Sequence, residues 1–309
     1  MAIQILLLIT GLMLLVVGSN YLLKSAIDLS LKLKLSKVVI GLTVVSFATS
    51  APELLISISS ALKGSADIAI SNVIGSNIAN LGLVLGTALC FTKIKIPKSN
   101  MKFDWTFLMI ISFLFFYFIN DLSVSRSEGV LLFLALILFL VFIIKIRDDA
   151  DVEEIKINTS SNYKILILIL VSSTLLYFGS ELFVSSSIYF AEYFGVSERV
   201  IGLTLVAIGT SLPELVTTLV AIYKSELDIS IGNIIGSNIF NILAVIGLTS
   251  IITDLNILSE RILSFDIYVM ILFSFILVFF YYSENKRFLN AYHGIIYILL
   301  FVTYYIYII

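Results

Sequence analysis

The chain has 309 residues, of which 60% are hydrophobic and 13% are charged, with a formal net charge of −2. A soluble domain is nearer half apolar and a quarter charged, so this composition indicates an integral membrane protein with no basic field for nucleic acid. One cysteine and one histidine exclude an internal disulfide and a cysteine-rich metal site, and they make an enzyme the weakest functional class.

The apolar residues gather in ten stretches, each long enough to cross a bilayer core of about 30 Å as a helix. The first is expected to be a retained helix, because no basic leader or small-residue cleavage pattern accompanies it. The predicted fold is therefore an all-α integral membrane protein with ten spans. They cover residues 3–23, 38–61, 66–91, 104–120, 128–146, 164–188, 200–222, 229–252, 263–282 and 290–308.

The basic residues predict an orientation for these spans. Fifteen of the 19 Lys and Arg residues lie in or beside the odd-numbered loops, and only Lys63, Arg126, Arg199 and Arg261 fall in even-numbered loops. Because cytoplasmic loops carry the excess of positive charge, both termini are expected outside the cell membrane. The longest loop, residues 147–162, is then cytoplasmic, and its acidic run is read as a solvated linker in preference to a calcium sensor.

The two halves of the chain are related by an internal repeat with an offset of 161 residues. About half of the positions in the motif 41–86 are identical to their partners in the motif 202–247. We therefore predict five-helix repeats at residues 1–146 and 163–309, joined by the linker 147–162. An odd number of spans per repeat inverts the second copy, and inverted repeats with sites near the midplane are typical of secondary transporters.

Each repeat contains a proline inside its second apolar stretch. The two copies read FATSAPELLI from residue 47 and IGTSLPELVT from residue 208. Proline lacks an N–H and clashes with the carbonyl four residues earlier, so Pro52 should free the carbonyl of Ala48, and Pro213 that of Gly209. A carbonyl in hydrocarbon needs a partner from protein, water or an ion. Spans two and seven are therefore predicted to be broken helices.

A glutamate follows each proline, near the middle of the predicted span. An ionised acid at that depth costs at least about 2.5–3.5 kcal/mol on insertion scales, so a positive partner is expected beside Glu53 and Glu214. Ser50 and Ser211 lie three residues before these glutamates, in the spacing of a capping box that restarts a helix. We expect the box to form, but it does not explain why the helix breaks twice at related places, and an ion site does.

The following span of each repeat adds a stripe of polar residues. NVIGSNIAN begins at residue 72 and NIIGSNIFN at residue 233, so that Asn72, Ser76 and Asn80 share one helical face, as do their partners. Gly75 and Gly236 are expected to allow close approach of another helix. Such residues can simply hold helices together. Beside the paired glutamates, a ligand role is the stronger reading.

All of these groups are oxygen donors, which disfavours zinc and copper. Calcium takes six to eight oxygens from carboxylates, carbonyls and amides, and two glutamates neutralise one divalent cation. The hydroxyls and freed carbonyls also suit sodium. One cavity could therefore hold Ca²⁺ or several Na⁺ in turn, and this mutual exclusion is the logic of exchange.

At these residues the sequence resembles the cation/calcium exchanger superfamily, and in particular its prokaryotic sodium/calcium exchanger branch, across essentially the whole chain. The resemblance implies a monomeric antiporter in the lipid bilayer, without a cofactor, that extrudes Ca²⁺ in exchange for Na⁺ by alternating access. It also implies the ligand set Glu53, Glu214, Thr49, Thr210, Ser50, Ser211, Ser76, Ser237, Asn80, Asn241, Ser46 and Ala207.

Two departures and two alternatives accompany this resemblance. The first repeat has Ser46 where the second has Ala207, with little consequence expected. Potassium-dependent relatives carry an aspartate at the position of Asn241, so two asparagines predict transport that is independent of K⁺. A Ca²⁺/H⁺ antiporter is the first alternative, although the paired Thr-Ser residues favour sodium. A passive cation channel is the second, and the repeat disfavours it.

Overall fold

The computed structural model describes residues 1–96, 98, 100–146, 161–195, 207–283 and 288–308, and these are almost entirely helical. The fold follows from the composition, because a helix satisfies its backbone hydrogen bonds internally and can therefore sit in hydrocarbon. The linker predicted at 147–162 lies almost wholly outside the described residues. Within the described residues, the chain divides into two compact units, each assembled from segments of both halves.

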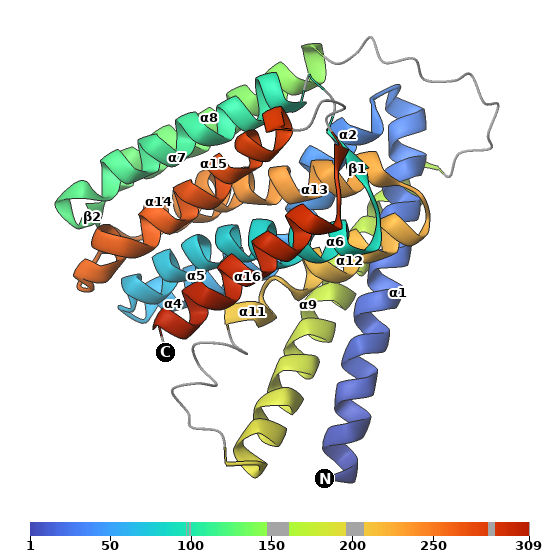
Figure 1. Ribbon diagram of the computed structural model, residues 1–309, viewed down its shortest axis with the longest axis horizontal. Helices are drawn as coiled ribbons and strands as arrows, with labels where there is room; N and C mark the ends of the chain where they lie inside the picture. Colours follow the sequence, from blue (N-terminus) through green and yellow to red (C-terminus); the bar gives the residue numbers. More distant parts are fainter. Residues whose placement is uncertain (97, 99, 147–160, 196–206, 284–287, 309) are drawn as a thin grey trace. The chain divides into compact units, whose positions relative to one another are not determined.

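The first unit comprises Met1–Ala51, Phe142–Asn233 and Val302–Ile309. Its two long helices, α1 and α9, lie side by side (Figure 1). A Cβ on Gly11 of α1 would stand 2.8 Å from the carbonyl oxygen of Gly179 in α9, so only glycine permits this approach. The elements of this unit are α1 (Ala2–Leu33), α2 (Lys37–Ile40), η1 (Gly41–Val45), α3 (Ser46–Thr49), α9 (Asn162–Tyr193), α11 (Ala207–Gly209), α12 (Leu212–Tyr223) and the first part of α13 (Leu227–Phe240).

The second unit comprises Pro52–Val141 and Ile234–Phe301. Two glycine contacts hold its helices close: a Cβ on Gly294 would lie 2.5 Å from the oxygen of Gly86, and one on Gly129 would lie 2.8 Å from the oxygen of Gly247. Its helices are α4 (Ala51–Leu62), α5 (Ala66–Ala79), η2 (Asn80–Leu85), α6 (Gly86–Phe91), η3 (Asn100–Trp105), α7 (Thr106–Phe118), η4 (Ile119–Asp121), most of α8 (Arg126–Ile146), the last part of α13, η6 (Asn241–Ile246), α14 (Gly247–Ile252), η7 (Ile262–Asp266), α15 (Ile267–Ser283) and the first part of α16 (Ala291–Ile308).

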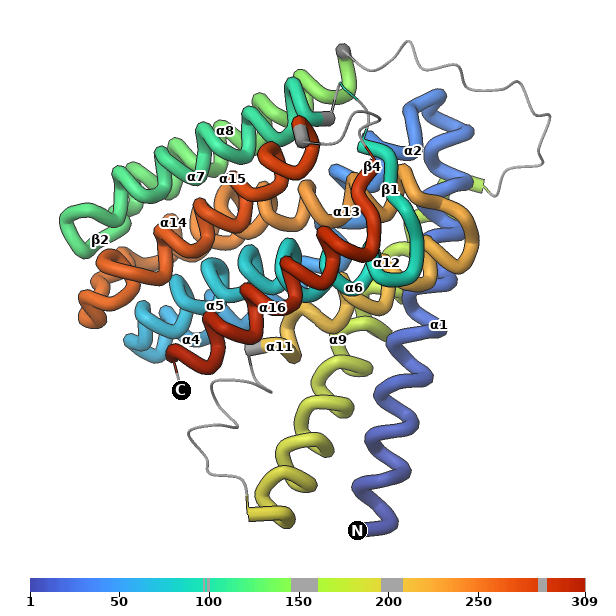
Figure 2. Tube along the Cα trace, viewed as in Figure 1, coloured from blue at the N-terminus to red at the C-terminus, as the bar shows by residue number. Residues whose placement is uncertain are grey.

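Two short antiparallel strand pairs connect distant parts of the second unit. Strand β1 (Ile94–Lys95) pairs with β4 (Phe288–Leu289), and the two strands can be seen side by side in Figure 2. Strand β2 (Ser123–Val124) pairs with β3 (Leu255–Asn256). Ile94 and Leu255 are separated by the repeat offset of 161 residues. Each pair therefore joins an element of one half of the chain to an element of the other.

Eight described helices are long and apolar enough to cross a membrane, or nine if the bent pair of Lys37–Thr49 and Ala51–Leu62 is one span. This confirms a multi-pass helical membrane protein. The predicted seventh span is represented among the described residues by α11 and α12, because residues 200–206 lie outside them. The count of ten spans stays a prediction.

Candidate cation site

Both predicted helix breaks are present, and they have the same backbone conformation. Ser50 has φ −84° and ψ 5°, and Ser211, its partner in the repeat, has φ −87° and ψ 4°. At the first break the chain bends by 43° between α3 and α4. Proline at positions 52 and 213 accounts for this, because neither ring nitrogen can donate to the preceding turn. Glu53 and Glu214 lie in the first turns of α4 and α12.

The prediction of a capping box at each break is wrong for the second break, at Ser211. Ser211 occupies the N-cap position of α12, but its side chain makes no capping hydrogen bond. A cap hydroxyl reaches the third helical N–H from an extended backbone, and Ser211, with ψ near zero, is not extended. At the other break, the Ser50 hydroxyl donates to the carboxylate of Glu214. The Ser211 hydroxyl is therefore available for another role.

Buried oxygen atoms of residues 46–50 contact Glu214 and Asn233 in the first unit. Ser50 Oγ donates to Glu214 Oε1 at 3.2 Å, and both side chains are buried, with Glu214 at 0% exposure. Next to Ser50 in sequence, Thr49 Oγ1 donates to Asn233 Oδ1 at 3.1 Å. Ser46 Oγ lies 3.1 Å from the backbone oxygen of Asn233. Carboxylate, hydroxyl and amide oxygens of this kind are the ligands that hard cations such as Ca²⁺ take in proteins.

The carbonyl of Gly209, which Pro213 leaves without its helical partner, accepts one hydrogen bond from a neighbouring helix. Ser180 Oγ, on α9, donates to Gly209 O at 2.6 Å. A carbonyl has two lone pairs, so this oxygen retains one for a second partner. Ser19 is the repeat partner of Ser180, and its hydroxyl instead lies 3.0 Å from Thr217 Oγ1. The two breaks therefore differ in what the helix beside them contributes.

In the second unit, Glu53 lies next to the polar stripe of α5. Asn72 Nδ2 donates to the backbone oxygen of Glu53 at 3.2 Å and to Ser57 Oγ at 3.0 Å. The Glu53 side chain is 0% exposed. The expectation for Gly75 is wrong, because a Cβ there would meet nothing within 4 Å among the described atoms. Close packing in this unit uses other glycines.

Asn80 and Asn241 begin the π-helical segments η2 and η6. Such segments rotate the residues that follow and are frequent at functional sites. Asn80 Nδ2 donates to Asn238 Oδ1 at 3.0 Å, and Asn241 Nδ2 donates to Asn77 Oδ1 at 3.1 Å. Asn77 and Asn238 were not among the predicted ligands. Their identity in both copies of the repeat, at an offset of 161, is the signal that could have identified them.

The remaining predicted ligands are buried on the expected elements. Ser76 on α5 is 1% exposed and Ser237 on α13 is 0% exposed, while Thr210 between α11 and α12 is 7% exposed. Ser211 Oγ is buried with no hydrogen-bond partner among the described residues. Ala207 is the first residue of α11, and its side chain lies outside the described part of the chain. Every described side chain of the predicted set is thus shielded from solvent.

The described residues thus form a multi-pass helical membrane protein with two buried helix breaks that carry oxygen donors. A family model for the sodium/calcium exchanger protein matches residues 3–145 and 164–309. The chain therefore belongs to the sodium/calcium exchanger family.

The chain is similar to several known proteins along nearly its whole length. CaxA of Alkalimonas amylolytica is 34% identical over 305 residues, covering 96% of this chain and 95% of that protein. Sodium/calcium exchanger MaX1 of Methanosarcina acetivorans is 33% identical, covering 98% and 97%. The structure of the sodium-calcium exchanger NCX_Mj soaked with 2.5 mM Na⁺ and 1 mM Sr²⁺ superposes with a TM-score of 0.82 at 30% identity, covering 97% of both chains.

Proposed function

We propose that this protein is a secondary antiporter that exchanges Na⁺ for Ca²⁺ by alternating access, extrudes Ca²⁺ and does not require K⁺. The observation that carries the proposal is the buried contact between Ser50 and Glu214, in which a carboxylate with no exposed surface lies at a helix break rich in hydroxyl oxygens. Oxygen ligands of this kind suit Ca²⁺ and Na⁺. Family membership supports the same pair of ions.

Both glutamates are proposed as Ca²⁺ ligands. Glu53 and Glu214 are repeat partners, each follows a proline, and each is 0% exposed. Two carboxylates neutralise one divalent cation, and the hydroxyl and amide oxygens of the remaining predicted ligands would complete its shell or bind Na⁺ when Ca²⁺ leaves. Each ion then excludes the other, which makes the two fluxes obligatorily coupled.

Two five-helix repeats, residues 1–146 and 163–309, are proposed to be inverted relative to each other, giving ten spans. Several features at the repeat offset support this proposal: the matching backbone angles of Ser50 and Ser211, the π-helical segments that begin at Asn80 and Asn241, and the reciprocal asparagine contacts. A two-fold relation makes residue pairs exchange their contacts in this way.

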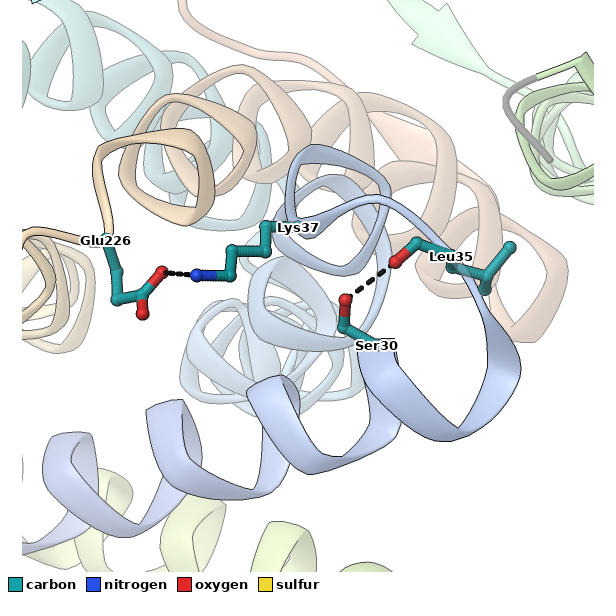
Figure 3. Close-up of polar contacts among 4 residues, drawn as sticks. All are labelled: Ser30, Leu35, Lys37 and Glu226. Atoms are coloured by element: carbon teal, nitrogen blue, oxygen red, sulfur yellow. Dashed lines mark hydrogen bonds and ion pairs between the residues drawn. The ribbon is translucent and has the colours of Figure 1, made fainter. Parts of the chain in front are cut away.

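We further propose that the loops near Lys37 and Glu226 are cytoplasmic, with both termini outside. The Lys37 ammonium and Glu226 carboxylate form an ion pair of 2.7 Å (Figure 3), which supports placing the proposed first and seventh loops on one side. A cysteine introduced at Lys34 of a Cys90→Ser protein should react with a membrane-impermeant maleimide in inside-out vesicles. Labelling in right-side-out vesicles alone would reverse the orientation.

The function is tested by ⁴⁵Ca²⁺ uptake into proteoliposomes loaded with Na⁺ and diluted into buffer free of Na⁺ and K⁺. We expect uptake that requires the outward Na⁺ gradient and is unchanged when K⁺ is added. Uptake driven by a proton gradient alone would establish the Ca²⁺/H⁺ alternative. Flux that is independent of any counter-ion would establish a channel.

A further inference from the structure

Four buried asparagines in the second unit form a hydrogen-bonded chain. Asn77 lies on α5 and Asn80 at the start of η2, and their repeat partners Asn238 and Asn241 lie on α13 and at the start of η6. All four side chains are at most 2% exposed. Asn77 and Asn238 fall outside the predicted ligand set, so their role in transport is open.

The backbone determines which way each of these amides points. Asn238 Nδ2 donates to the backbone oxygen of Asn77 at 3.3 Å, and Asn77 Nδ2 donates to the backbone oxygen of Asn238 at the same distance. A backbone carbonyl can only accept, so each of these side chains must turn its NH₂ group toward it. The second amide hydrogen of Asn77 faces the sulfur of Met270, 3.5 Å from Nδ2. The Oδ1 atoms of Asn77 and Asn238 are therefore left to accept.

The orientation of the Asn77 and Asn238 amides in turn determines that of the Asn241 and Asn80 amides. Asn238 Oδ1 accepts from Asn80 Nδ2, and Asn77 Oδ1 accepts from Asn241 Nδ2. Because Asn80 and Asn241 must each present an NH₂ group, their own Oδ1 atoms point the other way. Both Oδ1 atoms are buried and have no hydrogen-bond partner among the described residues. A buried amide oxygen without a partner is costly, and a cation would compensate it.

We propose that Asn77 and Asn238 are positioning residues, which hold the amides of Asn241 and Asn80 so that two carbonyl oxygens, and no N–H group, are offered to the transported ion. The inference rests on the proposed function, since it assigns the ligand atoms of the same site. Without the two positioning residues, the ligand amides could rotate by half a turn and present donors, which repel a cation. The competing role is helix adhesion alone, in which polar side chains join α5 to α13.

The test is a double-mutant cycle in proteoliposomes. The Na⁺ concentration that half-maximally drives ⁴⁵Ca²⁺ release is measured for wild type, Asn77→Ala, Asn241→Ala and the double variant, together with the melting temperature of each in detergent. Loss of one hydrogen bond that orients a ligand should raise this Na⁺ concentration about three- to tenfold and leave the maximal rate within about twofold. Because Asn77 acts through Asn241, the double variant should be no weaker than Asn241→Ala.

Other results overturn the proposal. If Asn77→Ala keeps the wild-type Na⁺ dependence, or lowers only the melting temperature, the asparagine contacts join helices and do nothing more. If the two effects multiply in the double variant, Asn77 does not act through Asn241. The pair Asn238→Ala and Asn80→Ala repeats the test if an Asn77 variant fails to fold. Wild-type vesicles without Na⁺-driven flux would instead refute the proposed function, so the two failures are distinguishable.

Discussion

Glu214→Gln removes one negative charge from the proposed site while keeping its shape. The glutamine Oε1 can still accept from Ser50, so the contact at 3.2 Å and the helix break should persist. Because the side chain is 0% exposed, bulk water cannot reach the site to solvate a cation in place of the lost carboxylate. Removing one partner of a buried ion pair costs about 3–5 kcal/mol. At about 1.4 kcal/mol per factor of ten, Ca²⁺ affinity should fall about 10²- to 10⁴-fold.

The assay is ⁴⁵Ca²⁺ binding and Na⁺-driven uptake by the purified variant, with its melting temperature and gel-filtration profile recorded as checks on folding. Glu181→Gln is the matched control, because Glu181 lies on α9 with its side chain exposed and undergoes the same change of charge. That control should behave like wild type. A Glu214→Gln protein whose Ca²⁺ affinity stays within about threefold of wild type would refute the assignment of this carboxylate as a ligand, given the cost of a lost buried charge.

Three further predictions concern stability. Ser180→Ala removes the hydroxyl that donates at 2.6 Å to the carbonyl freed at the second break, and unfolding in detergent should become about 1–3 kcal/mol easier; an unchanged melting temperature would mean that another group satisfies this carbonyl. Gly129→Ala places a Cβ 2.8 Å from backbone on α14 and should cost about 1–3 kcal/mol, whereas Gly75→Ala, with open space around it, should be neutral; equal melting temperatures would contradict the packing argument. Lys37→Met breaks an ion pair in which the lysine is 43% and Glu226 15% exposed, so it should change stability by no more than about 1 kcal/mol; a loss of several kcal/mol in chemical unfolding would show that the pair is far less solvated than these exposures indicate.

The two helix breaks could be predicted because their cause is local. Proline acts on its own turn, so Pro52 and Pro213 place the breaks from the chain alone, and the structure has Ser50 and Ser211 in the same non-helical conformation. The capping box is equally local, yet it was predicted wrongly for Ser211. Its spacing is a necessary condition only, and whether the hydroxyl reaches the helix depends on a backbone angle that the residue types do not determine.

The reciprocal asparagine contacts could not be derived from spacing. Helical periodicity places Asn72, Ser76 and Asn80 on one face, and Asn77 falls off that stripe. Its partner, Asn241, is 164 residues away in the chain. Only the packing of two segments distant in sequence brings a donor of one to an acceptor of the other. The same holds for Ser180, whose acceptor at Gly209 belongs to a different helix.

By itself, the sequence determined that this is a multi-pass helical membrane protein, that its halves repeat, and that oxygen donors gather at two proline breaks. These properties follow from composition and from local covalent geometry, which act within a few residues. The tertiary structure alone decided that Ser50 meets Glu214, that Asn233 meets Thr49, and that the amides of Asn80 and Asn241 donate to Asn238 and Asn77. Hydrogen bonds between distant segments depend on how helices pack, and that is a property of the whole core.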